Sequence, residues 1–174
     1  MPLLYHSVPH QMEGHKLHPL SLLAALHPHL HALAAAKYKD RSHLSLKEVS
    51  PLGCLWTDVV FFSPVHPQEI YSALRKLGQA PAPAKFFEIP HTVFDPSLTT
   101  ILVPEISIEG KTLSEQPVPF SAQALGRFSA LPTATYAYFS HTLSLGHQPL
   151  LFAGVPHILY KGSLDISHAN IISL

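Results

Sequence analysis

The sequence predicts an α+β fold with a split, mostly antiparallel sheet and two or three helices that lie mainly in the N-terminal half. Two observations support this fold class. Short apolar segments separated by turn residues occur along most of the chain, whereas helical patterns are concentrated before residue 78. The 17 prolines keep each element short. With 174 residues the chain suits one core, so we expect a single domain, residues 1–174, with an α-rich lobe at 1–78 and a β-rich lobe at 85–174.

The N-terminal elements follow from local patterns. Residues 1–8 predict a first strand that Pro9 ends, and residues 20–37 predict a helix that Pro28 kinks or restarts. Residues 37–41, KYKDR, form the densest charge cluster of the chain. This cluster is either an exposed helix C-terminus, where cations suit the helix dipole, or a binding patch.

The centre of the predicted fold is residues 53–77, which hold the only Trp and the only Cys. A buried strand is expected at residues 55–62, a proline-bracketed turn at 63–67 and an amphipathic helix at 67–77 that Gly78 closes. A turn between a strand and a helix can present polar groups to a ligand, so this turn is a candidate binding element.

The C-terminal part is predicted to supply most of the strands. A short helix is expected at residues 120–128, and residues 133–145 suit either a helix or a strand. A turn at Glu109 and Gly110 suggests a hairpin. Strands are expected at residues 85–90, 97–104, 106–108, 150–153, 157–160 and 171–172.

Charged residues are scarce and apolar residues are common. Asp, Glu, Lys and Arg make up 13% of the chain, hydrophobic residues make up 47%, and the formal net charge is zero. No lysine- or arginine-rich stripe is present, so a general electrostatic affinity for nucleic acid is not expected. The low charge instead favours an apolar surface that a second copy covers in a homodimer.

Cellular location is expected to be the cytoplasm. One cysteine fits a reducing compartment, and the start of the chain has no secretory signal pattern. No apolar run reaches the length of about 18 residues that a membrane span requires. A membrane is therefore not an expected partner.

The 14 histidines raise the question of a metal site. His6 and His10 are four residues apart, but Pro9 excludes a regular helix there. No HExxH or CxxC pattern occurs, and Cys54 begins an apolar segment where packing is the simpler role. No metal ligands are therefore assigned, although a histidine-rich metal-binding protein remains an alternative.

Three segments, in this order, carry a family resemblance. They are residues 4–7 (LYHS), residues 61–67 (FFSPVHP) and residues 155–162 (VPHILYKG). Together they resemble the ADP-ribosyltransferase superfold, in particular the DarT-type DNA ADP-ribosyltransferases. The resemblance covers about a third of the chain. It implies a compact split-sheet domain that binds NAD between its half-sheets and transfers ADP-ribose to a nucleic acid or protein acceptor.

The same resemblance implies roles for individual residues. His6 is expected to contact the ribose next to the nicotinamide and to take part in catalysis, and Phe62, Ser63 and His66 are expected on the nicotinamide side. His157 stands about where the family carries its catalytic glutamate, which makes it the second candidate catalytic residue.

An N-terminal basic segment contacts the phosphates in this superfold, so Arg41 and Lys37 are assigned to the cofactor's phosphates. Both residues belong to the KYKDR cluster. Arginine supplies a bidentate donor and lysine a point charge for such a role.

Alternatives remain open at this stage. Glu105 or another acid could supply the missing carboxylate, or the protein could bind NAD or a related nucleotide without transferring it. The RNA 2′-phosphotransferase branch shares the fold and handles a phosphate with basic residues and histidine. A different class is a non-enzymatic interaction module, such as a toxin–antitoxin or defence-type partner.

Overall fold

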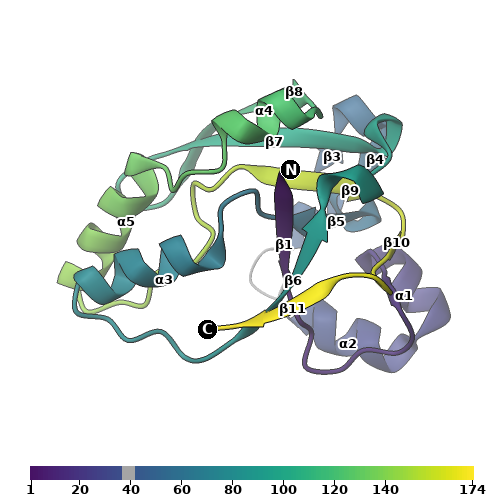
Figure 1. Cartoon of the computed structure of the whole chain (residues 1–174), viewed down its shortest axis with the longest axis horizontal. Helices are drawn as coiled ribbons and strands as arrows, with labels where there is room; N and C mark the ends of the chain where they lie inside the picture. The colour runs from purple at the N-terminus through teal and green to yellow at the C-terminus, as the bar shows by residue number, and fades with distance from the viewer. Residues whose placement is uncertain (37–41) are drawn as a thin grey trace.

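The structure describes residues 1–36 and 42–174, and this part of the chain has the predicted α+β fold (Figure 1). It is a computed structural model. Three of its α-helices precede residue 78 and two follow it. The described helices are α1 (Leu20–Leu26), α2 (Pro28–Ala36), α3 (Pro67–Lys76), α4 (Ala122–Arg127) and α5 (Thr133–Ser144).

The strands form two antiparallel sheets, which confirms the split sheet expected from the sequence. The larger sheet has the order β5-β9-β7-β8, and its strands are β5 (Val59–Phe62), β9 (His157–Lys161), β7 (Thr99–Ile106) and β8 (Thr112–Pro119). The smaller sheet has the order β1-β6-β11, with β1 (Leu3–Ser7), β6 (Lys85–Pro90) and β11 (Asn170–Ser173). Two short ladders pair β2 (Lys16–Leu17) with β10 (Leu164–Asp165), and β3 (Glu48–Val49) with β4 (Cys54–Leu55).

One bridge joins the two sheets, between Tyr5 of β1 and Ser63 just after β5. The Tyr5 amide donates to the Ser63 carbonyl at 2.9 Å, and the Ser63 amide donates to the Tyr5 carbonyl at 2.8 Å. The β1–β5 pairing does not continue past this bridge, so the sheets separate here. The edge of β5 that faces away from β9 is thereby left open toward the N-terminal helices.

The main core lies between the two sheets. Phe62 and Ile158 of the larger sheet meet Leu4, Phe87 and Ile89 of the smaller sheet, and all five are almost fully buried. This packing holds β1 across the end of β5. The point where the sheets diverge is therefore built on a rigid base.

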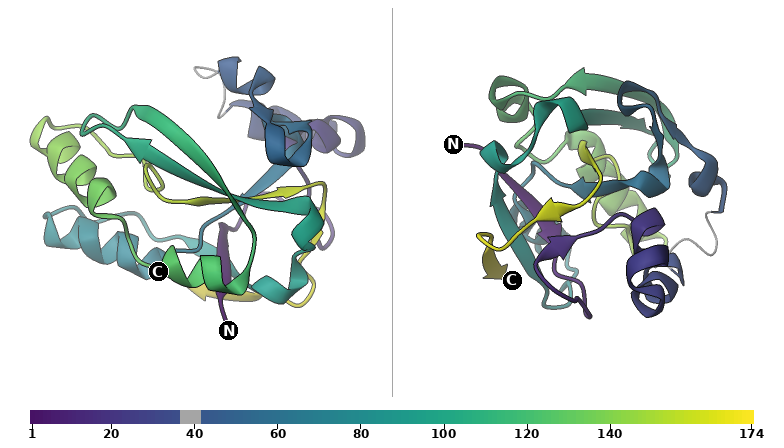
Figure 2. Two further views of the ribbon diagram at one scale, coloured as in Figure 1. Left: turned by 90° about the horizontal axis from the view of Figure 1, so that it is seen from above. Right: turned by 90° about the vertical axis from the view of Figure 1, so that its right-hand side faces the viewer.

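Helices α3 and α5 lie side by side at one end of the molecule (Figures 1 and 2). Their contact is an apolar cluster that includes Ile70 and Leu74 of α3 and Phe139 of α5. Pro67 occupies the first turn of α3, where its missing N–H costs nothing. Gly78 follows this helix with φ of +82°, a left-handed conformation that favours glycine.

Helices α1 and α2 pack against each other at the opposite end (Figure 1). Pro28 is the first residue of α2, so the expected interruption by this proline is a break between two helices. No residue of α1 is buried, and Leu30 alone is buried in α2. The side chains of Leu22, Leu26 and Leu33 remain exposed.

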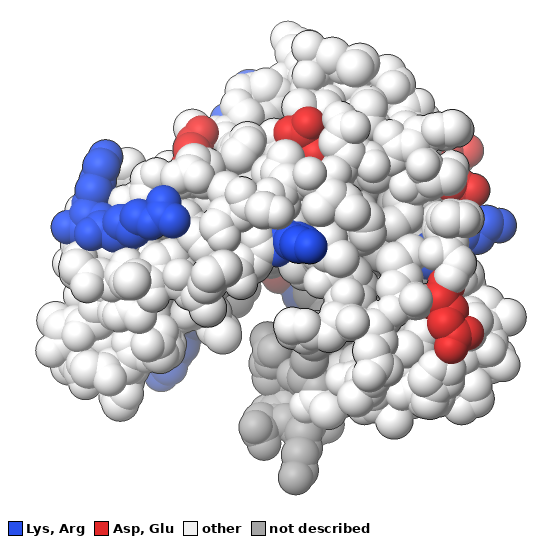
Figure 3. Space-filling model, turned by 60° about the horizontal axis from the view of Figure 1, so that its bottom comes forward, with Lys and Arg blue, Asp and Glu red and all other residues white. Residues whose placement is uncertain are grey.

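Formal charges are thinly spread over the surface. On the face drawn in Figure 3, lysine, arginine and acidic side chains lie scattered among residues of other kinds. This distribution agrees with the 13% of charged residues in the sequence. None of the described helices is both long enough and apolar enough to span a membrane.

Several elements differ from the sequence prediction for local reasons. Residues 56–58 form a short 3₁₀ turn before β5, because the Asp58 carboxylate accepts from the Leu55 amide at 2.9 Å. Residues 151–153 form turns and residue 150 has no regular structure, where a strand was expected at 150–153. Strand β8 was not predicted, because prolines argue against a strand. They are tolerated here because β8 lies at the edge of its sheet. The ambiguous residues 133–145 are mainly helix α5.

Candidate functional site

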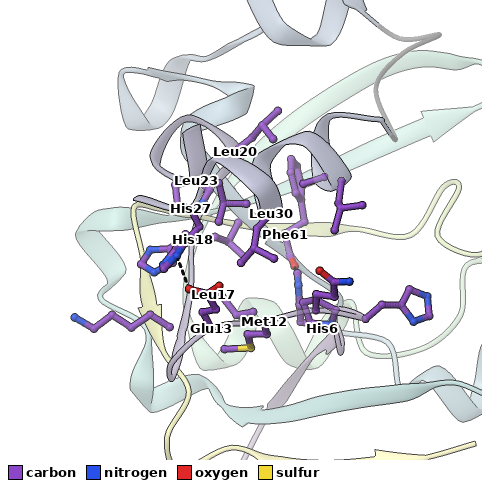
Figure 4. A pocket seen from close by; sticks show the side chains of 18 of the residues that line it. His6, Met12, Glu13, Leu17, His18, Leu20, Leu23, His27, Leu30 and Phe61 are labelled. Atoms are coloured by element: carbon purple, nitrogen blue, oxygen red, sulfur yellow. Dashed lines mark hydrogen bonds and ion pairs between the residues drawn. The ribbon is translucent and has the colours of Figure 1, made fainter. Parts of the chain in front are cut away.

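A cavity of about 400 Å³ opens beside the divergence of the two sheets. The end of β1, the segment after it, the N-terminal helices and the open edge of β5 enclose it (Figure 4). Its walls are mostly apolar. Among the lining residues are Met12, Leu17, Leu20, Leu23, Leu30, Leu33, Trp56, Val59, Val60 and Phe61. An apolar cavity with few polar groups is typical of a small-molecule site.

His6 forms one end of the cavity, next to Phe61 (Figure 4). Its Nδ1 lies 2.6 Å from the Phe61 carbonyl oxygen. Because a carbonyl only accepts, Nδ1 carries a proton and donates it to this contact. The His6 ring also packs against Phe62, with ring centroids 5.3 Å apart.

The position of His6 follows from strand geometry. Phe61 and Ser63 are two residues apart, so their backbone groups point to the same edge of β5. Ser63 uses that edge to pair with the backbone of Tyr5. His6 is the next residue of β1. Its side chain, in place of a backbone amide, donates a hydrogen bond to the Phe61 carbonyl. The histidine is therefore fixed at the point where the sheets separate.

Glu13 and His27 lie at the other end of the cavity (Figure 4), and His29, which does not line it, joins them in a polar cluster. His27 Nδ1 lies 2.9 Å from Glu13 Oε2, and His29 Nε2 lies 2.8 Å from Glu13 Oε1. Each carboxylate oxygen thus accepts from one imidazole. About half of the Glu13 side chain remains exposed, with a relative accessibility of 52%.

His18 completes this end of the cavity. Its ring centroid lies 5.8 Å from that of His27, and its Nδ1 lies 2.6 Å from the Ser163 hydroxyl. Burial lowers the pKa of His18 below its usual value, and nearby His27 and Lys16 act in the same direction. These effects all disfavour the protonated, charged form of His18.

Formal charge among the lining residues that the structure describes is limited to one residue of each sign. Among the described lining residues, Glu13 is the one carboxylate and Lys16 the one permanent cation. The described walls thus suit an uncharged or weakly charged group. They do not form a cluster of cations of the kind that binds a pyrophosphate.

Phe62 and Ser63 lie close to His6, but they are buried in the protein and do not face the cavity. Phe62 is buried in the main core and packs edge to face on Phe94. The Ser63 hydroxyl donates to the Val65 carbonyl at 3.0 Å and accepts from the Val65 amide at 3.1 Å. Both residues therefore shape the turn, and neither lines the cavity.

His66 lies on the other side of β1. Its ring packs on Tyr5 with centroids 4.8 Å apart, and its Nδ1 caps helix α3 by accepting from the Gln68 amide at 3.0 Å. Tyr5 and His6 are consecutive in β1, so they point to opposite faces. His66 accordingly lines a second hollow of about 410 Å³, together with Tyr5 and Glu69.

His157 is not among the residues that line the cavity. Its ring lies edge to face against Trp56 and Phe61, at 6.5 and 6.4 Å between centroids, and these two residues separate it from the cavity. Burial lowers the pKa of His157 to about 4, with a smaller opposing effect from Glu115. The structure thus keeps this candidate catalytic residue neutral and away from His6.

Lys37 and Arg41 lie outside the described residues. Glu105, the acid considered as a substitute for the family's glutamate, lies in β7 and accepts from the Ser114 hydroxyl at 2.8 Å. It is exposed and does not line the cavity. Among the described lining residues the carboxylate is instead that of Glu13, which the sequence patterns did not single out.

Metal binding receives no support from the described part of the chain. No group of three or more histidine, cysteine, aspartate or glutamate side chains there is arranged to hold an ion. Glu13, His27 and His29 come closest, but their nitrogens and oxygens bind one another.

No protein-family model, no curated protein and no solved structure matches this chain.

Proposed function

We propose that this chain is an ADP-ribosyltransferase-like protein that binds NAD or a related nucleotide in the cavity beside β1 and β5. The observation that carries the proposal is the position of His6. A histidine held by a backbone carbonyl stands where the two half-sheets separate, and it faces a mostly apolar cavity of about 400 Å³. The family resemblance assigns a histidine of the first strand to this role.

The cavity suits the nucleoside part of such a ligand. The half-buried Phe61 ring offers apolar surface to a base or nicotinamide ring, and the largely buried Trp56 adds a small exposed part to the same wall. Held through Nδ1 by the Phe61 carbonyl, the His6 ring lies at the end of the cavity where the ribose or carboxamide of the ligand would contact it. His157 and His66 have no part in this arrangement, since neither lines the cavity.

Transfer of ADP-ribose would follow from this binding mode. The bond between the nicotinamide nitrogen and ribose C1′ breaks, and nicotinamide leaves with the electron pair. An acceptor oxygen or nitrogen then bonds to C1′ and loses its proton. Release of nicotinamide from NAD in the presence of nucleic acid or protein acceptors is the assay for this step.

Calorimetric titration with NAD, ADP-ribose and nicotinamide tests the binding proposal. We expect NAD to bind the wild-type protein and His6→Ala to weaken binding by about tenfold, because the contact between the ligand and the His6 ring is lost. His147→Ala is the matched control, since His147 is exposed and does not line the cavity.

Two outcomes would contradict the proposal. One is an absence of heat and of any thermal shift with all three ligands. The other is equal affinity of the wild-type and His6→Ala proteins for NAD, with both variants folded.

A second candidate function is a non-enzymatic interaction module. The observation in its favour is the pair of helices α1 and α2, where Leu22, Leu26 and Leu33 are 39, 54 and 54% exposed. No lysine, arginine or acidic residue occurs in residues 17–36. Self-association through this surface gives twice the monomer mass in light scattering, and a purely monomeric protein would rule it out.

A further inference from the structure

The Glu13 cluster is the second polar end of the cavity, and the proposed function has not assigned it a role. Its carboxylate is bound through both oxygens, by His27 at 2.9 Å and by His29 at 2.8 Å. A free glutamate side chain would sample many rotamers, whereas this one is held in place by two partners. Such anchoring keeps the carboxylate at the rim of the cavity.

Glu13 retains the capacity to accept further hydrogen bonds. An ionised carboxylate has about four lone-pair sites, and the two imidazoles use two of them. The side chain is 52% exposed, so the remaining sites are accessible. Two adjacent sites on two oxygens match a pair of neighbouring hydroxyl donors, as in the vicinal diol of a ribose.

The charge of Glu13 itself favours such a neutral donor group. Among the described lining residues Glu13 is the one carboxylate and Lys16 the one permanent cation. Burial lowers the pKa of His18, which lies next to His27. A carboxylate accepts from a sugar hydroxyl and repels an anion, so the Glu13 side chain suits a sugar better than a phosphate.

We infer that Glu13, held by His27 and His29, is the residue that recognises the ribose hydroxyls of the ligand. This inference rests on the proposed nucleotide binding and adds the specificity of the same cavity. His6 and Glu13 then mark the two polar ends of one site, with apolar side chains between them (Figure 4).

Calorimetry with NAD and two analogues tests the inference. In one analogue the nicotinamide-side ribose lacks both hydroxyls, and in the other the adenine-side ribose lacks them. The wild-type protein should bind one of these analogues about tenfold or more weaker than NAD, because hydrogen bonds to a charged acceptor are lost. Glu13→Gln should bind NAD correspondingly weaker, and it should no longer discriminate against that analogue.

Control variants separate recognition from folding. Glu109→Gln changes an exposed carboxylate in the β7–β8 turn and should leave all affinities unchanged. Glu13→Asp keeps the charge but withdraws it by one methylene, and it should also lose discrimination. Thermal unfolding of each variant checks that the fold persists.

The outcomes are distinguishable. If the wild-type protein binds NAD but discriminates against neither analogue, or if Glu13→Gln discriminates as well as wild type, the inference is wrong and the proposed function stands. If the wild-type protein binds none of the three ligands, the proposed function fails and this inference fails with it.

Discussion

At the scale of single residues, the histidines of this protein have different structural roles. His6 bonds to an open strand edge and faces a cavity, His66 caps a helix, and His157 is enclosed by aromatic rings. The surroundings, not the residue type, decide these roles. A count of histidines in the sequence therefore says little about function.

His157 makes stability depend on pH. Burial holds its pKa at about 4 in the folded protein, against an ordinary value of 6.5. Between these values the unfolded chain binds a proton that the folded chain does not bind, so the free energy of unfolding falls as the pH is lowered. The loss is at most on the order of 3 kcal/mol, and it is absent above the upper value.

Urea unfolding of wild type and His157→Asn at about pH 7 and about pH 5 measures this contribution. We expect the variant to be less stable at the higher pH, because ring packing is lost, but to lose less stability on acidification. His147→Asn, which changes an exposed histidine, should behave like wild type. An unchanged pH dependence in His157→Asn would show that His157 is not the group responsible.

At the scale of elements, Gly154 allows a tight connection between helix α5 and strand β9 of the larger sheet. Gly154 lies between α5 and β9 with φ of +75°. A Cβ atom there would lie 2.6 Å from Ile106 Cδ1 and 2.8 Å from the buried Thr135 hydroxyl. Thr135 itself donates to the Ala153 carbonyl at 2.9 Å, so this contact has little room to relax.

Gly154→Ala should therefore reduce the free energy of unfolding by about 2–4 kcal/mol, from backbone strain and overpacking together. Gly146→Ala is a matched control, because Gly146 has the same φ of +75° with no atom within 4 Å of an added Cβ. It should cost only about 1 kcal/mol. Equal losses in the two variants, measured by urea unfolding, would contradict the packing argument.

Elements with strong local signals were predictable from the sequence. The strand at residues 85–90 and the turn and helix that follow β5 have the expected limits within a residue or two, because prolines and Gly78 mark them. Strand β8 was missed because its burial is low and it carries two prolines. A segment with these features forms a strand here because β7 pairs with it.

At the scale of the whole molecule, the cavity could not be predicted from the sequence. Its walls come from β1, β5, two helices and the segment between β1 and α1, which meet only in the folded chain. Glu13 and His27 are distant in the sequence and carry no motif. Of the candidate residues, His6 alone lines the cavity among those the structure describes.

The central claim is that a nucleotide binds between His6 and Glu13. Titration of the isotopically labelled protein with NAD, followed by NMR chemical shifts, tests it most directly. We predict that the signals of His6, Glu13 and Phe61 shift together and saturate, while those of His66 and Glu109 stay in place. Saturating shifts centred on His66 and Tyr5, or no shifts at all, would contradict the account.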